Sequence, residues 1–376
     1  MPESISVELQ ALRRRATEFT ALAAKIATRH ANAPLPAEVR AELITAAKSS
    51  GLFAMTQPRE FGGSEAGPLA LTIARETLAS ANNPLTHLAF GPGPSVLAGA
   101  QGRVRDVYLQ PMLRGEKRAA FGFTEARNAA RHTWARAEGE TLVINGEKAY
   151  VTGGAEADFI NVLLELDGDG GKARAMVVVD RAAPGVNIAE RFQSLEGGSH
   201  ARITFTDVRV PRDQLLGTPG EGMPQAMRQI GDTRLLLAAE ACGLMLWIDD
   251  YVAQHLQADH PSGEPLGKRE GVRLRYADLR IDAYTARSTL YRAARLADTG
   301  ENAVNEVMIA KVYCTEALGR SIDTAIQLVG GRALDQGHPL EKLYRRVRSL
   351  RIAEGASDVL RLNIIRGRLD LNKGSL

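Results

Sequence analysis

A single carboxylate, Glu354, stands at a helix junction in the stretch whose residue types best suit chemistry. The stretch runs from Gln327 to Arg361: a Gly-Gly pair breaks one helix, a basic helix follows, and Ala-Glu-Gly precedes a last helix. The glycine beside Glu354 lets a flat ligand come close. Glu354 is therefore a candidate general base, and its alternative role is a solvated charge partner of the helix N-terminus.

Basic side chains gather on the helix before Glu354. They are Lys342, Arg345, Arg346, Arg348 and Arg351. This run is either a solvated helix face or a contact for a phosphate-bearing ligand or a partner subunit. The net charge is only +3 and no comparable Lys/Arg block occurs earlier in the chain, so we expect no nucleic-acid partner.

The two cysteines and the apolar segments limit the remaining classes of protein. Cys242 and Cys314 lie far apart, outside any metal-ligand or CxxC spacing, so we expect two small core residues and no metal site. No apolar run approaches the roughly 20 residues of a membrane span, and the N-terminus lacks the apolar segment of a signal peptide. We therefore expect a cytoplasmic protein.

Three kinds of periodicity divide the chain. Leu9, Leu12 and Ala16 begin a helical pattern that continues to about residue 118, short apolar strands follow, and long helices return after Pro211. Asn145-Gly146 is a strong hairpin signal. The pattern predicts an α+β, mostly α fold: an N-terminal all-α domain (1–118), a middle antiparallel β-barrel domain (119–222) and a C-terminal four-helix bundle (223–376).

This order of domains and four motifs resemble the acyl-CoA dehydrogenase family of flavoproteins over nearly the whole chain. The motifs are Gly-Leu-Phe to Phe-Gly-Gly at 51–63, Phe-Gly-Phe-Thr-Glu at 121–125 with Ile-Asn-Gly-Glu-Lys-Ala-Tyr-Val-Thr at 144–152, Phe-Thr-Asp-Val-Arg-Val-Pro at 205–211 with the glycines of 217–222, and Glu354-Gly355. Each motif is loose alone, and their order and spacing together are specific.

The resemblance implies FAD as the cofactor. It places one strand along the flavin ring, an aromatic-Val-Thr segment behind it, and the end of a bundle helix against the dinucleotide of a neighbouring subunit. The residues at these positions are Phe121, Phe123, Thr124, Tyr150, Val151, Thr152, Gln327, Gly330 and Gly331. Tyr150 has the alternative role of an ordinary strand aromatic, and His200 is either a polar contact near the flavin edge or a surface residue.

The resemblance also implies the reaction. Glu354 takes the position of the base that removes the α-proton of an acyl thioester, bound to CoA or to an acyl carrier, while FAD N5 takes the β-hydride. Arg234 and Gly355 fall on the substrate side, although Arg234 could equally form an ion pair between helices. Implied partners are an electron-transfer flavoprotein or another electron acceptor, and further copies of the chain in a homodimer or homotetramer.

Two segments depart from the family pattern. The family's Pro-x-x-Gly-Ser-Asp after Thr-Glu is Ala126 to Arg131 here, and the loop 261–267 lacks the usual Arg and Phe. Arg127 or Arg131 is a candidate replacement for the lost phosphate contact. The departures favour one alternative, a flavin-deficient binding or assembly subunit of the same fold. A second alternative is a flavin oxidase or monooxygenase acting on a non-thioester substrate.

Overall fold

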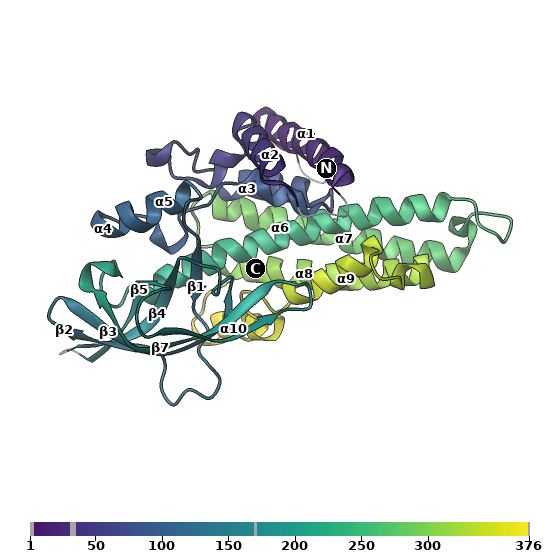
Figure 1. Ribbon diagram of the computed structural model, residues 1–376. Helices are drawn as coiled ribbons and strands as arrows, with labels where there is room; N and C mark the ends of the chain where they lie inside the picture. The colour runs from purple at the N-terminus through teal and green to yellow at the C-terminus, as the bar shows by residue number, and fades with distance from the viewer. Residues whose placement is uncertain (1–3, 31–34, 169–170, 375–376) are drawn as a thin grey trace. The chain divides into compact units, whose positions relative to one another are not determined.

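The computed structural model describes residues 4–30, 35–168 and 171–374, which form two compact units (Figure 1). Unit 1 comprises Met1–Phe90 and Gly231–Leu376, and unit 2 comprises Gly91–Ile230. The chain re-enters unit 1 inside helix α6 (Gly222–Gln257). The three domain boundaries expected from the sequence stay a prediction.

The N-terminal helices of unit 1 are α1 (Val7–Arg29), α2 (Ala37–Ser49) and α3 (Pro68–Ala79). Helix α1 begins after Ser6, whose hydroxyl accepts from the Leu9 amide, and it buries one apolar stripe. Glu76 of α3 is 3% exposed, and it accepts hydrogen bonds from Arg287 Nε and Tyr291 Oη, both at 2.6 Å. These two residues belong to α7 (Glu270–Asp298), so a buried ion pair joins α3 to the long helices.

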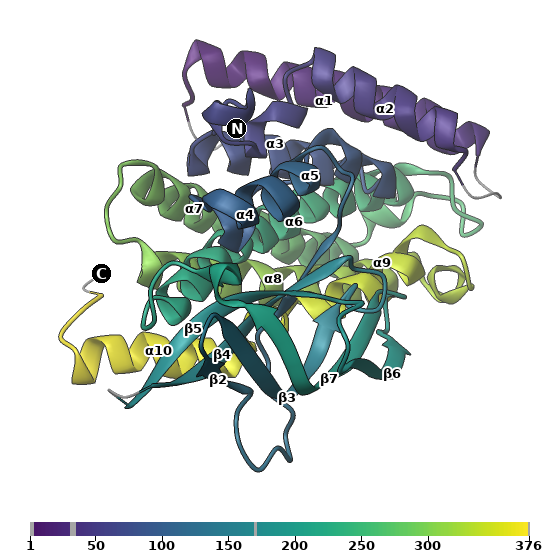
Figure 2. The same cartoon turned by 60° about the vertical axis from the view of Figure 1, so that its left-hand side comes forward.

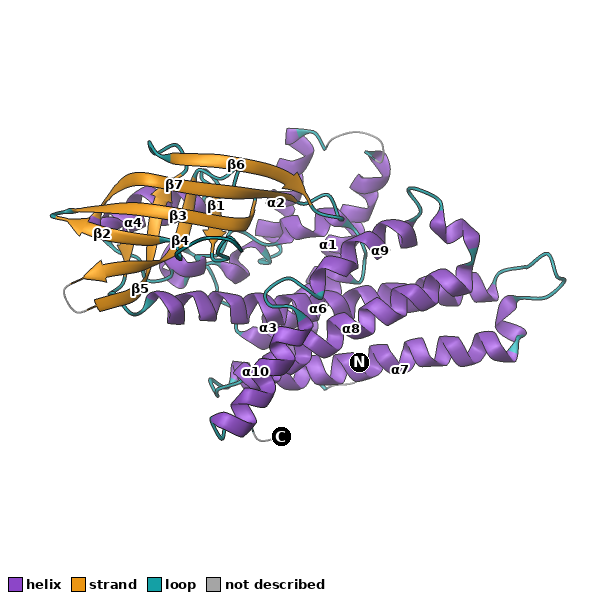
Figure 3. Cartoon of the chain, turned by 90° about the horizontal axis from the view of Figure 1, so that it is seen from below, coloured by secondary structure: helices purple, strands orange, loops and turns teal. Residues whose placement is uncertain are grey.

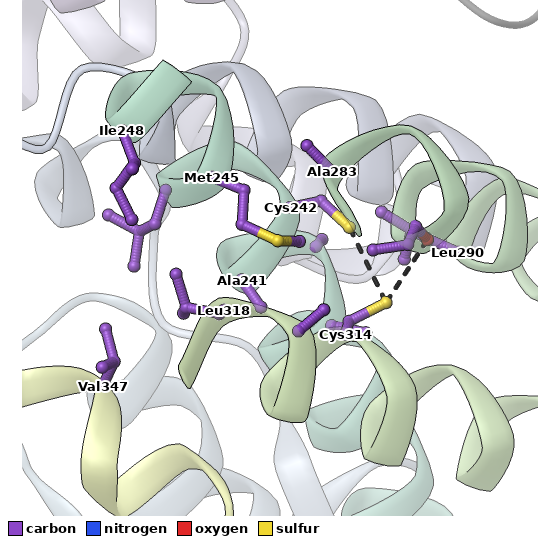
Figure 4. Close-up of a cluster of buried hydrophobic side chains, with 14 of the residues drawn as sticks. Ala241, Cys242, Met245, Ile248, Ala283, Leu290, Cys314, Leu318 and Val347 are labelled. Atoms are coloured by element: carbon purple, nitrogen blue, oxygen red, sulfur yellow. Dashed lines mark hydrogen bonds between the residues drawn. The ribbon is translucent and has the colours of Figure 1, made fainter. Parts of the chain in front are cut away.

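The long helices of unit 1 form the predicted bundle. Besides α6 and α7 they are α8 (Val304–Val329), α9 (Pro339–Leu350) and α10 (Ser357–Asp370), and α6, α7 and α8 run alongside one another (Figures 1 and 3). Their core includes Met245, Leu290 and Leu318 (Figure 4). Cys242 and Cys314 are buried free thiols with sulfurs 3.7 Å apart, so both are core residues, as predicted.

Within the described residues, no helix is both long and apolar enough to cross a membrane.

Unit 2 begins with a short helical segment made of α4 (Gly102–Val104), a π-helix (Arg105–Leu109) and α5 (Gln110–Leu113), followed by one eight-stranded sheet (Figure 2). The strand order is β6-β7-β3-β2-β4-β5-β8, and β1 pairs with β4. The strands are β1 (Ala119–Gly122), β2 (Trp134–Glu138), β3 (Thr141–Thr152), β4 (Phe159–Gly168), β5 (Gly171–Asp180), β6 (Val186–Gln193), β7 (Ser199–Pro211) and β8 (Leu215–Leu216).

The predicted order of all-α, β and all-α regions is confirmed, whereas the sheet is mixed rather than purely antiparallel. Strands β1 and β2 each pair with β4 in parallel. The prediction assumed that strands adjacent in sequence pair through tight turns, which makes them antiparallel. Strand β4 instead follows β3 in the chain without pairing with it, and takes two earlier strands as neighbours.

The hairpin predicted at Asn145-Gly146 is wrong, because β3 runs straight through this dipeptide. The register against β7 shifts between Ile144 and Gly146, which makes the site a β-bulge. The Asn145 side chain donates to Asp207 Oδ1 at 3.0 Å and accepts from the Asp207 amide at 3.0 Å. A Cβ on Gly146 would lie 2.5 Å from Thr133 Cα. Tertiary contacts, rather than a turn, therefore require this pair.

Candidate active site

Glu354 lies in the turn between α9 and α10, with a left-handed backbone conformation (φ 55°). A non-glycine residue in this region costs roughly 1 kcal/mol or more. Gly355 follows with φ 103°, and a Cβ there would lie 3.0 Å from Leu360 Cδ2. The Ser357 amide donates to the Arg351 carbonyl at 3.0 Å and closes the turn. The local sequence therefore holds a carboxylate on a strained backbone, a feature that clusters at functional sites.

Two cationic side chains hold the carbonyl groups of this turn. Arg234 Nε, from α6, donates to the Glu354 carbonyl at 2.9 Å. Lys311 Nζ, from α8, donates to the Gly355 carbonyl at 2.9 Å. The turn is thus fixed from two helices by charge-assisted hydrogen bonds, which leave the Glu354 carboxylate itself out of these contacts.

Burial and the charges around the turn shift the pKa of Glu354 in opposite directions. Burial raises the pKa of the Glu354 carboxyl, and the positive charges of Arg234 and Lys311 oppose part of the rise. Burial, together with the charge of Arg234, lowers the pKa of Lys311 to about 8. Nearby Glu316 differs: burial raises its pKa, but hydrogen bonds from Ser357 and Arg351 outweigh that effect and leave the pKa below its usual value. Glu354 is the carboxylate of this turn whose pKa is raised, which suits a base.

A second group of predicted site residues lies on β3 in unit 2. The register of β3 against β7 shifts between Lys148 and Val151, and Tyr150 has φ 54°. This bulge turns Tyr150 outward, with 68% of the residue exposed, while Lys148 and Val151 are buried. Strand alternation then leaves Thr152 exposed beside Tyr150. The bulge therefore presents an aromatic ring and a hydroxyl on the surface of unit 2.

An aromatic chain continues from Tyr150. Its ring meets Phe192 edge to face at 5.5 Å between centroids, and Phe192 stacks on His200 at 5.5 Å. His200 Nδ1 is 3.3 Å from Thr152 Oγ1, so His200 belongs to this cluster instead of standing alone. Tyr150 also differs from an ordinary buried strand aromatic, because its side chain is exposed.

The predicted residues at 121–124 lie beside this bulge. Strand β1 ends at Gly122, the rings of Phe121 and Phe123 stack at 5.7 Å, and the Thr124 carbonyl accepts from the Ala149 amide at 2.9 Å. The Thr124 side chain is exposed. The structure thus brings Thr124 and Tyr150 onto neighbouring segments of unit 2.

A buried ion pair that the sequence reasoning missed supports this region. Lys148 Nζ donates to Glu125 Oε1 at 2.6 Å and to the Phe123 carbonyl at 3.3 Å. Glu125 Oε2 accepts from the Thr133 amide and hydroxyl at 3.1 and 2.9 Å. Burial lowers the pKa of Lys148 to about 8, against the opposing charge of Glu125. Because Lys148 directly follows the polar stretch Asn-Gly-Glu at 145–147, no local signal marked it as buried.

The segment 126–131 keeps one arginine within unit 2. Arg131 Nη2 lies 2.5 Å from Asp167 Oδ1, and its guanidinium stands 4.5 Å from the centre of the Trp134 ring. Any phosphate contact by Arg131 must compete with this ion pair, whereas Arg127 has an exposed side chain. The assignment of the phosphate contact to Arg127 or Arg131 therefore stays a prediction.

The remaining predicted cofactor residues lie at the end of α8 in unit 1. Gly330 ends the helix with φ 84°, and its amide donates to the Ile326 carbonyl at 2.8 Å. Gln327, Gly330 and Gly331 are exposed. The structure therefore brings the predicted site residues together in three groups: the Glu354 turn and the α8 end in unit 1, and the β1–β3 surface in unit 2.

Comparison with known proteins agrees with this arrangement. The N-terminal, middle and C-terminal domain models of acyl-CoA dehydrogenase match residues 6–116, 120–208 and 220–369. The human mitochondrial short-chain specific acyl-CoA dehydrogenase is 31% identical over 85% of this chain and 80% of its own length. Cyclohexane-1-carbonyl-CoA dehydrogenase of Geobacter metallireducens is 27% identical over 97% of both chains. A crystal structure of a "probable acyl CoA dehydrogenase" from Mycobacterium abscessus has a TM-score of 0.82 at 26% identity and covers 96% of this chain and 98% of its own.

The three matched domain models define a class of flavin-dependent oxidoreductases. The chain belongs to the acyl-CoA dehydrogenase family, as the three domain models and the human relative show. Its cofactor is accordingly FAD.

The side chains on unit 2 fit this cofactor. Thr124, Tyr150 and Thr152 are all exposed, so two hydroxyls and one aromatic face are available to a flat ring with a polar edge. Lys148, at one end of the bulge that exposes Tyr150, forms the buried ion pair with Glu125.

Proposed function

We propose that the chain is a flavin-dependent α,β-dehydrogenase of an acyl-CoA thioester and that Glu354 removes the α-proton. The Glu354 turn supports this proposal most directly. Its carboxylate has a raised pKa, and its left-handed backbone accepts hydrogen bonds from Arg234 and Lys311. The α-proton of a thioester is weakly acidic, so its removal requires a base with a raised pKa and a polarised carbonyl. Unit 1 supplies the base.

The chain's own residues have distinct roles in this proposal. Glu354 holds the proton taken from the substrate, and Gly355, because it lacks a side chain, lets the turn pack closely against Leu360 and Arg234. Arg234 orients the turn from α6 through the Glu354 carbonyl. FAD, when bound, accepts the β-hydrogen as hydride. Thr124, Tyr150 and Thr152 are the residues we assign to hold its ring.

We further infer that Gln327, Gly330 and Gly331 contact the cofactor of a neighbouring copy of the chain. Their exposure at the end of α8 supports this assignment, because residues that serve a second subunit must reach the surface of their own. The active form is then a closed oligomer, a dimer or tetramer. Electrons leave to an electron-transfer flavoprotein or another acceptor.

The relatives suggest the substrate class. Their names specify short-chain acyl-CoA and cyclohexane-1-carbonyl-CoA, and a relative from Clostridium sporogenes, 28% identical over 87% of this chain and 90% of its own length, is a 3-(aryl)acrylate reductase. We propose a small acyl group, linear or cyclic, on CoA. The alternative substrate is a thioester bound to an acyl carrier, and the experiment compares the two classes of thioester.

The test is anaerobic bleaching of the protein-bound flavin by butyryl-CoA, cyclohexane-carbonyl-CoA and the matching pantetheine thioesters. Wild-type protein should be yellow and should bleach, and Glu354→Gln should keep its flavin but bleach at least about 100-fold more slowly, the usual contribution of a general base. Asp358→Asn is the matched control, because that carboxylate is 93% exposed and pairs with Arg361. A colourless protein that takes up no added FAD would overturn the proposal and support a flavin-deficient assembly subunit.

A further inference from the structure

Lys311 lies in the middle of α8 with no solvent-exposed surface. Its ammonium donates to the Gly355 carbonyl at 2.9 Å, and over the described part of the chain no carboxylate oxygen lies within 4.0 Å of it. A buried ammonium without a carboxylate in contact is costly. Methionine would fill a similar volume without that cost. A charge kept at such a position points to a role beyond packing.

The geometry links Lys311 to Glu354 through the backbone. Lys311 and Arg234 hold the carbonyls of two consecutive residues, Gly355 and Glu354, from two different helices. Glu354 has a positive φ although it is not glycine, so the turn is strained at this residue and needs such outside contacts to persist. Loss of one contact frees one side of the turn and lets the Glu354 side chain change its direction.

The other charged groups around the turn pair with one another and not with Glu354. Glu316 on α8 already pairs with Arg351 at the end of α9, and on α10 Asp358 pairs with Arg361. Arg361 also stands 3.9 Å from Glu316. The positive charges that favour the ionised form of Glu354 are those of Arg234 and Lys311.

We propose that Lys311 is the positioning residue of Glu354: its ammonium fixes the left-handed turn through the Gly355 carbonyl and supplies a positive charge that keeps the Glu354 carboxylate ionised. The inference rests on the proposed function in taking Glu354 as the base. Lys311 touches neither the substrate nor the reacting atoms in this role, and acts through the turn.

The first test is the pH profile of anaerobic flavin bleaching by butyryl-CoA in Lys311→Met. Loss of the charge raises the pKa of Glu354, so the acid limb of the rate should move up by about one pH unit, which lowers the rate about tenfold on that limb. The substrate concentration for half-maximal rate should change much less. Lys311→Arg keeps the charge and should retain the wild-type position of the limb.

Lys25→Met is the matched control, because Lys25 is an exposed lysine on α1. It should leave both the rate and the pH profile unchanged. A Lys311→Met protein with the wild-type position of the acid limb would overturn the inference, whether its rate is lowered uniformly or unchanged, since a purely structural role changes the rate without moving the limb.

A second readout requires no substrate. The difference in melting temperature between a protein and its Glu354→Gln variant changes with pH until Glu354 is fully ionised, and then levels off. In the Lys311→Met background this levelling should occur about one pH unit higher than in the wild-type background. If no thioester bleaches the wild type, the proposed function fails and this measurement still tests Lys311. If bleaching depends on Glu354 but neither pH position moves, the inference about Lys311 fails alone.

Discussion

Lys148 in strand β3 and Lys311 in helix α8 are both completely buried, and burial lowers the pKa of each to about 8. Their surroundings differ. Lys148 contacts the Glu125 carboxylate at 2.6 Å, whereas Lys311 contacts a backbone carbonyl. When a buried lysine contacts a carboxylate, the two charges neutralise each other, and the pair has a structural role. A lysine on a carbonyl leaves its positive charge to act on other groups, here the Glu354 turn.

The largest effect expected from this contrast is on the stability of unit 2. Lys148→Met removes the cation from Glu125, whose side chain is 18% exposed, and leaves a poorly solvated carboxylate. We expect a loss of about 3 kcal/mol in the free energy of unfolding, measured by denaturant titration. Lys172→Met is the control: Lys172 is 61% exposed and 3.8 Å from Glu165, so its loss should be below about 0.5 kcal/mol. A loss below 1 kcal/mol for Lys148→Met would contradict the structural role given to the Lys148–Glu125 ion pair.

A double substitution sharpens the same contrast. Glu125→Gln removes the uncompensated charge that Lys148→Met creates, while a side-chain oxygen remains for the Thr133 hydrogen bonds. The double variant should therefore recover about 2 kcal/mol relative to the sum of the two single losses. Additive losses would show that packing, and not the ion pair, accounts for the cost at Lys148.

The sequence predicted the features that depend on residues close together in the chain, and missed those that depend on distant contacts. The order of helical and β regions came from local periodicity, and Glu354, Tyr150 and Thr124 came from short motifs whose residues are close in sequence. The partners of Glu354 were harder to recognise: the Lys311–Gly355 contact joins residues 44 positions apart, and Arg234–Glu354 joins residues 120 apart. Spacing carries no information about such contacts.

A charged residue inside an apolar pattern was a signal that sequence reasoning left unused. Lys311 interrupts the apolar face of α8, which is unusual for lysine unless it has a partner. The Asn145-Gly146 error has the related cause that a bulge and a hairpin favour the same dipeptide. Only the contacts with Thr133 and Asp207 distinguish the two.

A smaller effect is expected at Glu354 itself, with the opposite sign. Because burial raises its pKa, the native state binds a proton more tightly than the unfolded chain, and its contribution to stability is full below the unfolded pKa and falls as pH rises through the native pKa. Glu354→Gln should therefore stabilise the protein at pH 7 by on the order of 1 kcal/mol. The difference should disappear near pH 4, in thermal unfolding followed against pH. A destabilised Glu354→Gln at pH 7 would mean that the charges of Arg234 and Lys311 favour the ionised carboxylate more than burial opposes it.

The smallest effect isolates the backbone of the turn. Glu354→Gly and Glu354→Ala both remove the carboxylate, but only glycine adopts the left-handed conformation of residue 354 (φ 55°) without strain. Relief of about 1 kcal/mol of strain is partly offset by the greater freedom of glycine in the unfolded chain, so the Gly variant should be more stable than the Ala variant by about 0.5 kcal/mol. At Ala353, which lacks a positive φ, substitution by Gly should instead destabilise. If Ala and Gly at 354 are equally stable, the turn carries no strain for Lys311 and Arg234 to hold, and the role of Lys311 reduces to its charge.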